Sequence, residues 1–288
     1  MVASSEYTES TISLFHEAAA ANLATVGRRG NVIEIGPETA DDVMLTGDLH
    51  GHRRNFNLIC RIADLDARPR RHLVLQEVCH GGPTYPQNGG CMSHAMVEDI
   101  ARLKLQYPER VHFLLGNHEL AELTDYPIQK NKQMLNLLFH MGLEQMYGVD
   151  CERVRKALLE FLQTSPLAVR IGRGTFVCHS IPEGIDTRPF DRTIFDRPLD
   201  PLEFYERGDI FQMVWGRDHR PENAKAFAEM MDAQVLIHGH EPCAEGYAAP
   251  NPYQVILDCC SDRACYVVLS TDREWTQADV VARIERLG

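Results

Sequence analysis

Long apolar segments are missing from this chain. None of its 288 residues lies in a run approaching ~20 apolar residues, the length that a membrane-spanning helix requires. The first residues, MVASSE, carry neither the basic region nor the apolar core of a signal peptide. We therefore expect a cytoplasmic protein that has no membrane partner.

Paired cysteines and an excess of positive charge are missing as well. The nine cysteines are odd in number and contain no CxxC pair, which is unlike a disulfide framework and suits a reducing compartment. The 29 Lys and Arg residues against 41 Asp and Glu residues give a net charge of −12. A nucleic-acid partner is therefore not expected, because such proteins carry a basic surface. Acidic substrates are still compatible with the sequence, because bound metal ions can reverse the local field.

Short apolar runs alternate with helical patterns in the first half of the chain. Residues 43–46, 72–75 and 111–115 are predicted strands, and helices are predicted after the first of them and over residues 92–106. Alternation of strands and helices predicts a parallel sheet with right-handed crossovers.

The second half reads as a helical segment followed by β-structure. Residues 127–163 have helical spacing throughout and are predicted to be an insertion, and residues 167–178 form a predicted hairpin. Residues 182–220, rich in Pro, Asp and Arg, are predicted to run along the surface. Further strands are predicted over 234–237, 254–257 and 265–269, with a helix over 221–232 and another from Thr276. We expect an N-terminal extension over 1–40, a main domain over 41–272, and a C-terminal helix over 273–288 that packs on it.

Five predicted strands end in residues that can bind a metal ion. These residues are Asp48 with His50, Glu77 with His80, Asn117 with His118, His179, and His240. Residues two apart in an extended segment point the same way, so Asp48 and His50 can bind one ion. In two-metal sites, ions ~3.5–4 Å apart hold the attacking and leaving oxygens of a phosphoryl transfer. Each pair taken alone also fits a turn or a helix cap, and only their combination favours a metal site.

Four of these segments resemble the motifs of the calcineurin-like metallophosphoesterases. They are GDLHG at 47–51, GNHE at 116–119, CH at 178–179 and HGH at 238–240. They are most similar to the phosphoprotein-phosphatase branch and its bacterial relatives, from about residue 43 to 270. The resemblance implies a four-layer α/β/β/α sandwich of two mixed sheets, whereas the residues alone support an α/β fold with a helical insertion.

The resemblance also implies roles for individual residues. Two divalent or trivalent ions (Mn, Fe or Zn) would be bound by Asp48, His50, Glu77, Asn117, His179 and His240, with Glu77 bridging them. A hydroxide between the ions would be the nucleophile, and His118 would protonate the leaving oxygen.

The second motif departs from the family pattern GDxxDRG and reads QEVCHGG at 76–82. Glu77 stands in place of the bridging Asp, and we expect metal binding to be retained. His80 replaces the Asp that would orient His118, so it takes a catalytic role, or Glu122 or Asp125 orients His118, or His80 is itself a ligand.

Two arginines that bind substrate in the family are absent, because Gly81 and Leu115 occupy their positions. The candidates to replace them are Arg53, Arg54 and Arg217, and Arg217 is also a candidate catalytic residue. For each of them a solvated surface charge is the other interpretation.

The sequence thus predicts a metal-dependent phosphoesterase acting on phosphomonoesters, in small molecules or in phosphoproteins as a serine/threonine phosphatase. One alternative is a nucleotide or dinucleoside-polyphosphate hydrolase. A third reading, motivated by Glu77 and His80, is a degenerate metallophosphoesterase that serves as a binding or scaffold protein.

Overall fold

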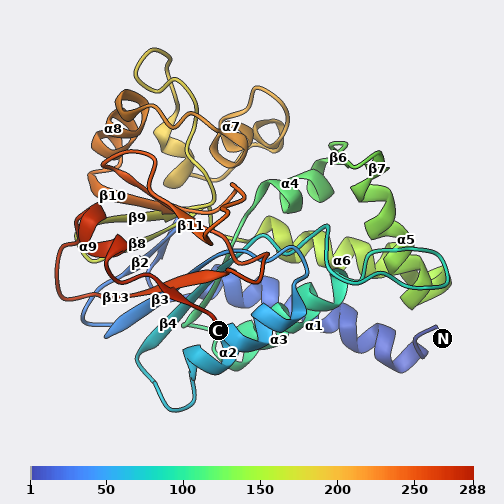
Figure 1. Cartoon of the computed structure of the whole chain (residues 1–288). Coiled ribbons are helices and arrows are strands. Elements are labelled where there is room, and N and C mark those ends of the chain that lie inside the picture. Colours follow the sequence, from blue (N-terminus) through green and yellow to red (C-terminus); the bar gives the residue numbers. More distant parts are fainter. Residues whose placement is uncertain (1) are drawn as a thin grey trace.

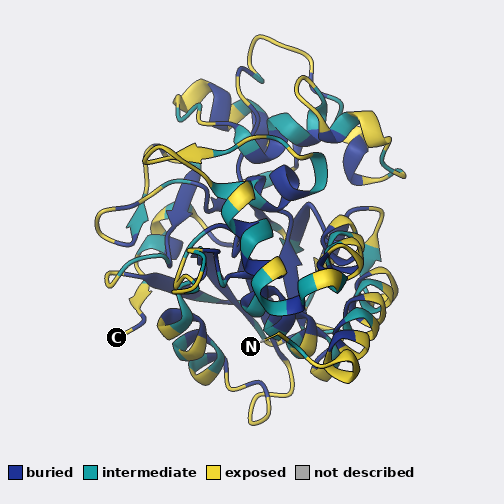
Figure 2. Cartoon of the chain, turned by 90° about the vertical axis from the view of Figure 1, so that its right-hand side faces the viewer, coloured by how far each residue is buried: buried dark blue, intermediate teal, exposed yellow. Residues whose placement is uncertain are grey.

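Two β-sheets lie face to face at the centre of the fold, and helices cover the outer side of each (Figure 1). The computed structural model describes residues 2–288. Aliphatic side chains from both sheets fill the space between them, among them Val43, Leu45, Val177 and Ile237. Figure 2 shows that the strands at the centre are mostly buried and that the exposed residues lie on the outer faces of the helices and in loops. The expected α/β/β/α sandwich is confirmed.

One sheet has five strands. In spatial order they are β14 (Glu285–Arg286), β13 (Cys265–Ser270), β3 (Asp42–Asp48), β4 (Arg71–Gln76) and β5 (Val111–Leu114). The last three strands run parallel, as predicted, and β13 runs antiparallel to β3. Because β3, β4 and β5 are parallel, their carboxyl ends lie at the same edge of the sheet.

The other sheet has seven strands. In spatial order they are β1 (Arg28–Arg29), β2 (Val32–Ile35), β8 (Ala168–Ile171), β9 (Gly174–Cys178), β10 (Ala233–His238), β12 (Gln254–Leu257) and β11 (Tyr247–Ala248). Strands β8 and β9 form the predicted hairpin, and β10 runs parallel to both β9 and β12. The carboxyl ends of β9 and β10 therefore also lie side by side.

Five helices cover the five-stranded sheet. They are α1 (Ser5–Ala24), α2 (Arg53–Ala63), α3 (His94–Gln106), α5 (Leu135–Tyr147) and α6 (Cys151–Gln163). Helix α1 packs against α3 and α6, and the rings of Phe15 and Phe161 stack with centroids 6.0 Å apart. The first 40 residues thus supply a helix to this layer and β2 to the opposite sheet.

The segment expected to be helical throughout begins with a hairpin. Strands β6 (Gln129–Lys130) and β7 (Gln133–Met134) precede α5, and a 3₁₀ turn, η1 (Gly148–Asp150), joins α5 to α6. Asn131 and Lys132 form the tight turn between the two strands with positive φ angles of 51° and 63°. The apolar spacing of α5 and α6 was informative, whereas this polar turn gave no comparable signal.

The prediction that residues 182–220 run along the surface is correct for most of the segment, which is exposed or half-buried, but it missed the structured elements and the buried residues. This segment contains η2 (Arg192–Phe195), η3 (Pro201–Phe204) and α7 (Asp209–Trp215). Its apolar residues, among them Phe190, Ile194 and Met213, are buried with α8 (Pro221–Met230) against the seven-stranded sheet. The many charged residues misled the prediction because they pair with one another at the outside, as Arg197 does with Asp191.

The C-terminal helix is shorter than expected. Helix α9 covers Gln277–Val281, and the chain then pairs with β13 through β14. Within residues 2–288, no helix combines the length and the apolar character that crossing a bilayer requires.

Candidate active site

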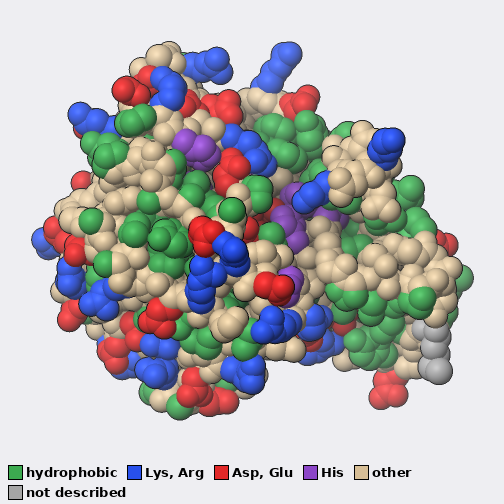
Figure 3. Space-filling model, viewed as in Figure 1, with side chains coloured by type: hydrophobic (Ala, Val, Ile, Leu, Met, Phe, Trp, Pro, Cys, Tyr) green, Lys and Arg blue, Asp and Glu red, His purple; other side chains and the backbone are tan. Residues whose placement is uncertain are grey.

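The carboxyl ends of five strands converge in one place. The residues found there are Asp48 at the end of β3, Glu77 after β4, Asn117 after β5, His179 after β9 and His240 after β10. His50 follows Asp48 in the loop before α2, so the structure brings all six predicted metal ligands together. In Figure 3, histidine side chains gather in the depression at the middle of the face, below α7 and beside α4 (Asn117–Thr124).

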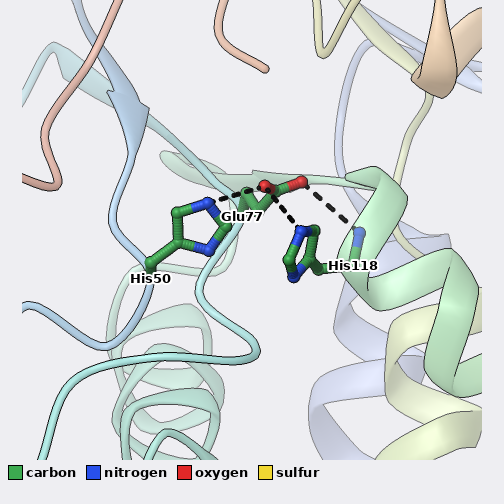
Figure 4. A group of neighbouring side chains, drawn as sticks. All are labelled: His50, Glu77 and His118. Atoms are coloured by element: carbon green, nitrogen blue, oxygen red, sulfur yellow. Dashed lines mark hydrogen bonds and ion pairs between the residues drawn. The ribbon is translucent and has the colours of Figure 1, made fainter. Parts of the chain in front are cut away.

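Glu77 lies at the centre of this group. Its Oε1 is 3.1 Å from His50 Nε2 and 3.9 Å from His118 Nε2 (Figure 4). Its Oε2 is 2.8 Å from His179 Nε2. Glu77 therefore belongs to two clusters of candidate ligand atoms, one with His50 and His118 and one with His179 and His240. A carboxylate shared by two clusters is what a bridging ligand requires.

Gly116 provides the room for the longer Glu77 side chain. A Cβ at Gly116 would lie 2.8 Å from Glu77 Oε2 and 2.5 Å from Glu119 Oε2. Both distances are shorter than real Cβ contacts, so a larger residue here would displace one or both carboxylates. The backbone of Glu77 is fixed from the other side, because its carbonyl accepts hydrogen bonds from the N–H groups of Leu49 and His50.

The donor set fits metal ions. Gln76 Nε2 donates to the carbonyl of Thr46, so its Oε1 faces His179 Nδ1 at 3.0 Å and accepts that proton. In the neutral form of His179, Nε2 is then an acceptor, yet it lies 2.9 Å from Asn117 Oδ1 and close to Glu77 Oε2, which are acceptors too. A cation would satisfy these three converging lone pairs.

Two further buried atoms of the site have no partner among the described residues, namely Asp48 Oδ1 and His240 Nε2. Buried polar atoms without a partner are costly, and they often mark the place of an ion. Mixed carboxylate, imidazole and amide ligands suit Mn, Fe or Zn better than Ca²⁺. The residues present therefore fit two such ions.

The charges of the site are unbalanced without a cation. Burial and, to a smaller extent, the nearby Glu77 carboxylate together raise the pKa of Asp48 to about 7. Burial also acts upwards on the pKa of Glu77, but His118, His179 and other imidazoles hold it well below its usual range. Two carboxylates in one buried site repel each other, and positive charge bound between them would relieve this repulsion.

The backbone of the site is strained. His50, Glu77, His80 and His240 adopt left-handed conformations with φ angles of 41°, 39°, 62° and 70°. This conformation costs a non-glycine residue on the order of 1 kcal/mol or more, and it persists only where the surroundings impose it. Each residue lies in the loop that directly follows a strand, so the turn aims its side chain back across the sheet edge.

His118 is connected to a buried carboxylate through His80. The Nδ1 atoms of the two rings are 2.9 Å apart, and His80 Nε2 is 2.7 Å from Glu122 Oε1. Glu122 is only 2% exposed, and Asn136 Nδ2 donates to it at 3.1 Å. Asp125, the other candidate partner, is exposed and pairs with Arg155. Both nitrogens of His80 are thus engaged by His118 and Glu122, away from the two clusters around Glu77.

Burial lowers the pKa of His118 to about 3, although the Glu77 carboxylate acts in the opposite direction. The imidazole therefore carries one proton in the metal-free site, and the contact with His80 decides which nitrogen holds it.

The arginines predicted to bind substrate pair with carboxylates of the chain. Arg53 pairs with Asp99, and Arg54 lies 3.4 Å from Asp262. Arg217 pairs with Glu241 at 2.9 Å, and its backbone N–H donates to Glu183.

Two residues that support the site were not singled out from the sequence. Glu119 is fully buried in the first turn of α4, and its Oε1 accepts from the N–H groups of Val78 and Cys79, which fixes the loop after β4. Gln76 orients His179, as described above. Their closeness in sequence to predicted ligands could have revealed them, since Glu119 lies two residues after Asn117 and Gln76 directly precedes Glu77.

Comparison with known proteins agrees with this geometry. The family model of the calcineurin-like phosphoesterases matches residues 42–244. A search of curated protein sequences gives no match. Similar solved structures include a protein serine/threonine phosphatase from Saccharomyces cerevisiae with similarity to human phosphatase PP5, at 14% identity and a TM-score of 0.68. That alignment covers 91% of this chain and 82% of the yeast chain.

Another similar structure is a cold-active protein-tyrosine phosphatase of a psychrophilic Shewanella species. It is 12% identical, covers 90% of this chain and 82% of the other, and has a TM-score of 0.56. At these identities the two likenesses establish the shared fold. The family model covers most of the chain, including the ends of β3, β4, β5, β9 and β10. This chain therefore belongs to the calcineurin-like phosphoesterase family, a family of hydrolases.

Proposed function

We propose that the chain hydrolyses phosphomonoesters with the help of two bound metal ions. The observation that carries this proposal is the position of Glu77, whose two oxygens face His50 on one side and His179 on the other. The substitution of Glu for the expected Asp leaves a carboxylate between the two clusters.

Residues of this chain would hold the ions. Asp48 and His50 lie at one cluster, Asn117, His179 and His240 lie at the other, and Glu77 is shared. Ions bound there would supply the positive charge that activates water near neutral pH and stabilises the transferred phosphoryl group. The dense packing around Gly116 and Glu119 would hold the ligand side chains in place before an ion binds.

The relay of Glu122, His80 and His118 would supply the proton for the leaving oxygen. Glu122 accepts from His80 Nε2, and when His80 is doubly protonated its Nδ1 donates to His118 Nδ1. The proton of His118 then resides on Nε2, which is the nitrogen that faces Glu77.

Transfer of this proton to the leaving oxygen balances within the relay. His118 Nε2 loses its proton, and the Nδ1 proton of His80 passes to His118 Nδ1. The His80–His118 contact and the His80–Glu122 contact then each keep one proton, and the relay can take up another proton from solvent. Glu122 orients His80, and through it His118, as the Asp expected at position 80 would have oriented His118.

Hydrolysis of p-nitrophenyl phosphate with added Mn²⁺, Fe²⁺ or Zn²⁺ tests the proposal. We expect metal-dependent turnover in the wild type, and loss of both metal and turnover in Asp48→Asn. Wild-type protein that contains stoichiometric metal and shows no turnover would contradict the proposal and favour the binding-protein alternative.

The identity of the phosphomonoester is a separate question. Phosphoserine or phosphothreonine in proteins and the phosphates of nucleotides are both compatible with this site. The relay and the metal ions would contact the leaving group only at its oxygen, so they do not discriminate between these substrates. Side chains around the depression have to discriminate between them.

A further inference from the structure

A cavity of about 590 Å³ lies beside the metal centre, between α7 and the loop that follows β9. Its lining includes Glu183, Arg188, Arg207, Phe211, Gln212 and Trp215. The ring of Trp215 also contacts the metal-ligand candidate His240, with centroids 6.2 Å apart. Trp215 therefore separates this cavity from the site by the thickness of one side chain.

One wall of the cavity is a rigid aromatic surface. Phe211 and Trp215 stack with centroids 5.5 Å apart and an interplanar angle of 20°. Tyr126 from the end of α4 packs edge-on against both rings, at 5.2 Å and 5.4 Å. Phe211 and Trp215 remain partly exposed, and Trp215 Nε1 is buried without a partner among the described residues. Such a wall is preorganised to stack a planar group.

Two arginines give the cavity a positively charged side. The side chains of Arg188 and Arg207 form no ion pair and no hydrogen bond within residues 2–288. Arg53, Arg54 and Arg217 have carboxylate partners, whereas both guanidinium groups at this cavity are free to bind an anion. A guanidinium group binds a phosphate through two parallel hydrogen bonds. The cavity thus has an anion-binding side and an aromatic side.

We propose that this cavity binds a nucleoside phosphate. The base would stack on the wall of Phe211 and Trp215, a first phosphate would lie at Arg188 and Arg207, and a second phosphate of the same ligand would extend to the metal centre. The proposal rests on the proposed function, because the phosphate to be hydrolysed would lie at the metal centre beyond Trp215. The cavity has the volume of a small-molecule site, which ranges from ~300 to ~1,000 Å³, and Gln212 offers both a donor and an acceptor for the edge of a base.

This assignment accounts for the substrate-binding arginines that are absent from their expected positions. Gly81 and Leu115 supply no cation close to the metal ligands. Arg188 and Arg207 restore two cations at the neighbouring cavity, where they recognise the body of the substrate. A nucleotide matches because it carries planar and anionic groups at adjacent positions.

Tryptophan fluorescence provides a test that needs no turnover. The chain has two tryptophans, and Trp275 is buried in the core between the sheets. We expect saturable quenching of full-length protein by the imidotriphosphate analogues of ATP and GTP. The quenching should disappear in Trp215→Phe, which keeps Trp275, and persist in Trp275→Phe, which keeps Trp215.

Variants at the cationic side measure its contribution. Arg188→Ala and Arg207→Ala are each expected to weaken binding of the analogues by about 10-fold or more, because a charge-assisted hydrogen bond is lost. Arg192→Ala is the matched control, since Arg192 bonds to the carbonyl of Met230 outside the cavity lining. Comparable KM changes for the nucleotide in active enzyme would support the same conclusion.

Three outcomes would overturn the inference. Quenching by inorganic phosphate that equals the quenching by the analogues at the same concentration would mean that only an anion is recognised. Quenching by a phosphoserine peptide and not by the analogues would assign the cavity to a peptide. Absence of any quenching in protein that hydrolyses p-nitrophenyl phosphate would exclude the cavity as a nucleotide site and leave the proposed function intact.

Discussion

Strands β4 and β5 carry a histidine–histidine contact near each of their two ends. Within the strands, His72 Nδ1 lies 3.0 Å from His112 Nε2. Beyond their carboxyl ends, His80 Nδ1 lies 2.9 Å from His118 Nδ1. All four rings are largely buried, so the two contacts are alike in distance and in packing.

Their charged neighbours differ. Burial lowers the pKa of His72 to about 4, and the cations of Arg110, Lys104 and Arg70 act in the same direction. His80 instead contacts the buried carboxylate of Glu122. A histidine pair surrounded by cations stays neutral and serves packing. A pair that ends in a carboxylate on one side and in a metal-ligand cluster on the other can move a proton.

The largest expected effect is on kcat, and it distinguishes the pair of His80 and His118 from the pair of His72 and His112. His118→Asn should lower kcat by about 10² to 10⁴-fold, because it removes the proton donor. Metal content, measured by elemental analysis, should be unchanged. His112→Asn is the matched control and should leave kcat within about 2-fold in protein that remains folded. Equal losses in both variants would contradict the distinction.

Acid should lower the stability of the protein through the pair of His72 and His112. The folded-state pKa of His72 is about 4 and its ordinary value is 6.5, so the unfolded chain binds more protons between these pH values. The free energy of unfolding should therefore fall as the pH is lowered from 6.5 to 4, by about 3 kcal/mol from His72 alone. Urea unfolding at several pH values measures this slope.

His72→Gln should flatten that slope, because glutamine does not titrate. A slope that is identical in this variant and in the wild type would show that His72 does not carry the acid sensitivity.

Removal of the Glu122 carboxylate, which contacts the pair of His80 and His118, should have an intermediate effect on activity. Glu122→Gln should lower kcat by about 10- to 100-fold, as is common for residues that orient a catalytic group. Its effect should not add to that of His118→Asn, because both act on one proton. Full additivity of the two losses in the double variant would count against a shared relay.

The smallest effect is expected at Asp125. Asp125→Asn should change kcat by no more than about 2-fold, because the side chain is exposed and pairs with Arg155 on the surface. A loss as large as that of Glu122→Gln would reassign the partner of His80.

Much of this arrangement follows from local sequence patterns. The apolar runs that end in GDLHG and GNHE located β3 and β5 and placed their polar ends at one edge. Period-3.6 spacing located α3, α5 and α6. These predictions succeed because a buried strand or an amphipathic helix is specified by its own residues.

Other parts depend on contacts that are distant in the chain. Glu122 was one of two candidates, and only folding places it against His80, 42 positions away. The surface prediction for residues 182–220 missed their buried residues, because the composition is polar and Phe190 and Phe204 become buried only against α8 and the seven-stranded sheet. The cavity at Arg188 and Trp215 joins two loops and a helix, so no single stretch of sequence contains it.

The left-handed residues of the site also limit how this protein can be made more robust. Glycine at His80 or His240 would relieve a backbone conformation that glycine adopts freely, and it would remove the side chain that the turn presents. At His80 it would also leave the buried Glu122 without its histidine partner, so these positions offer no gain in heat resistance. Asp64 ends α2 in the same conformation, with φ of 44°, away from the site. Glycine at this helix end offers tolerance to heat without loss of chemistry.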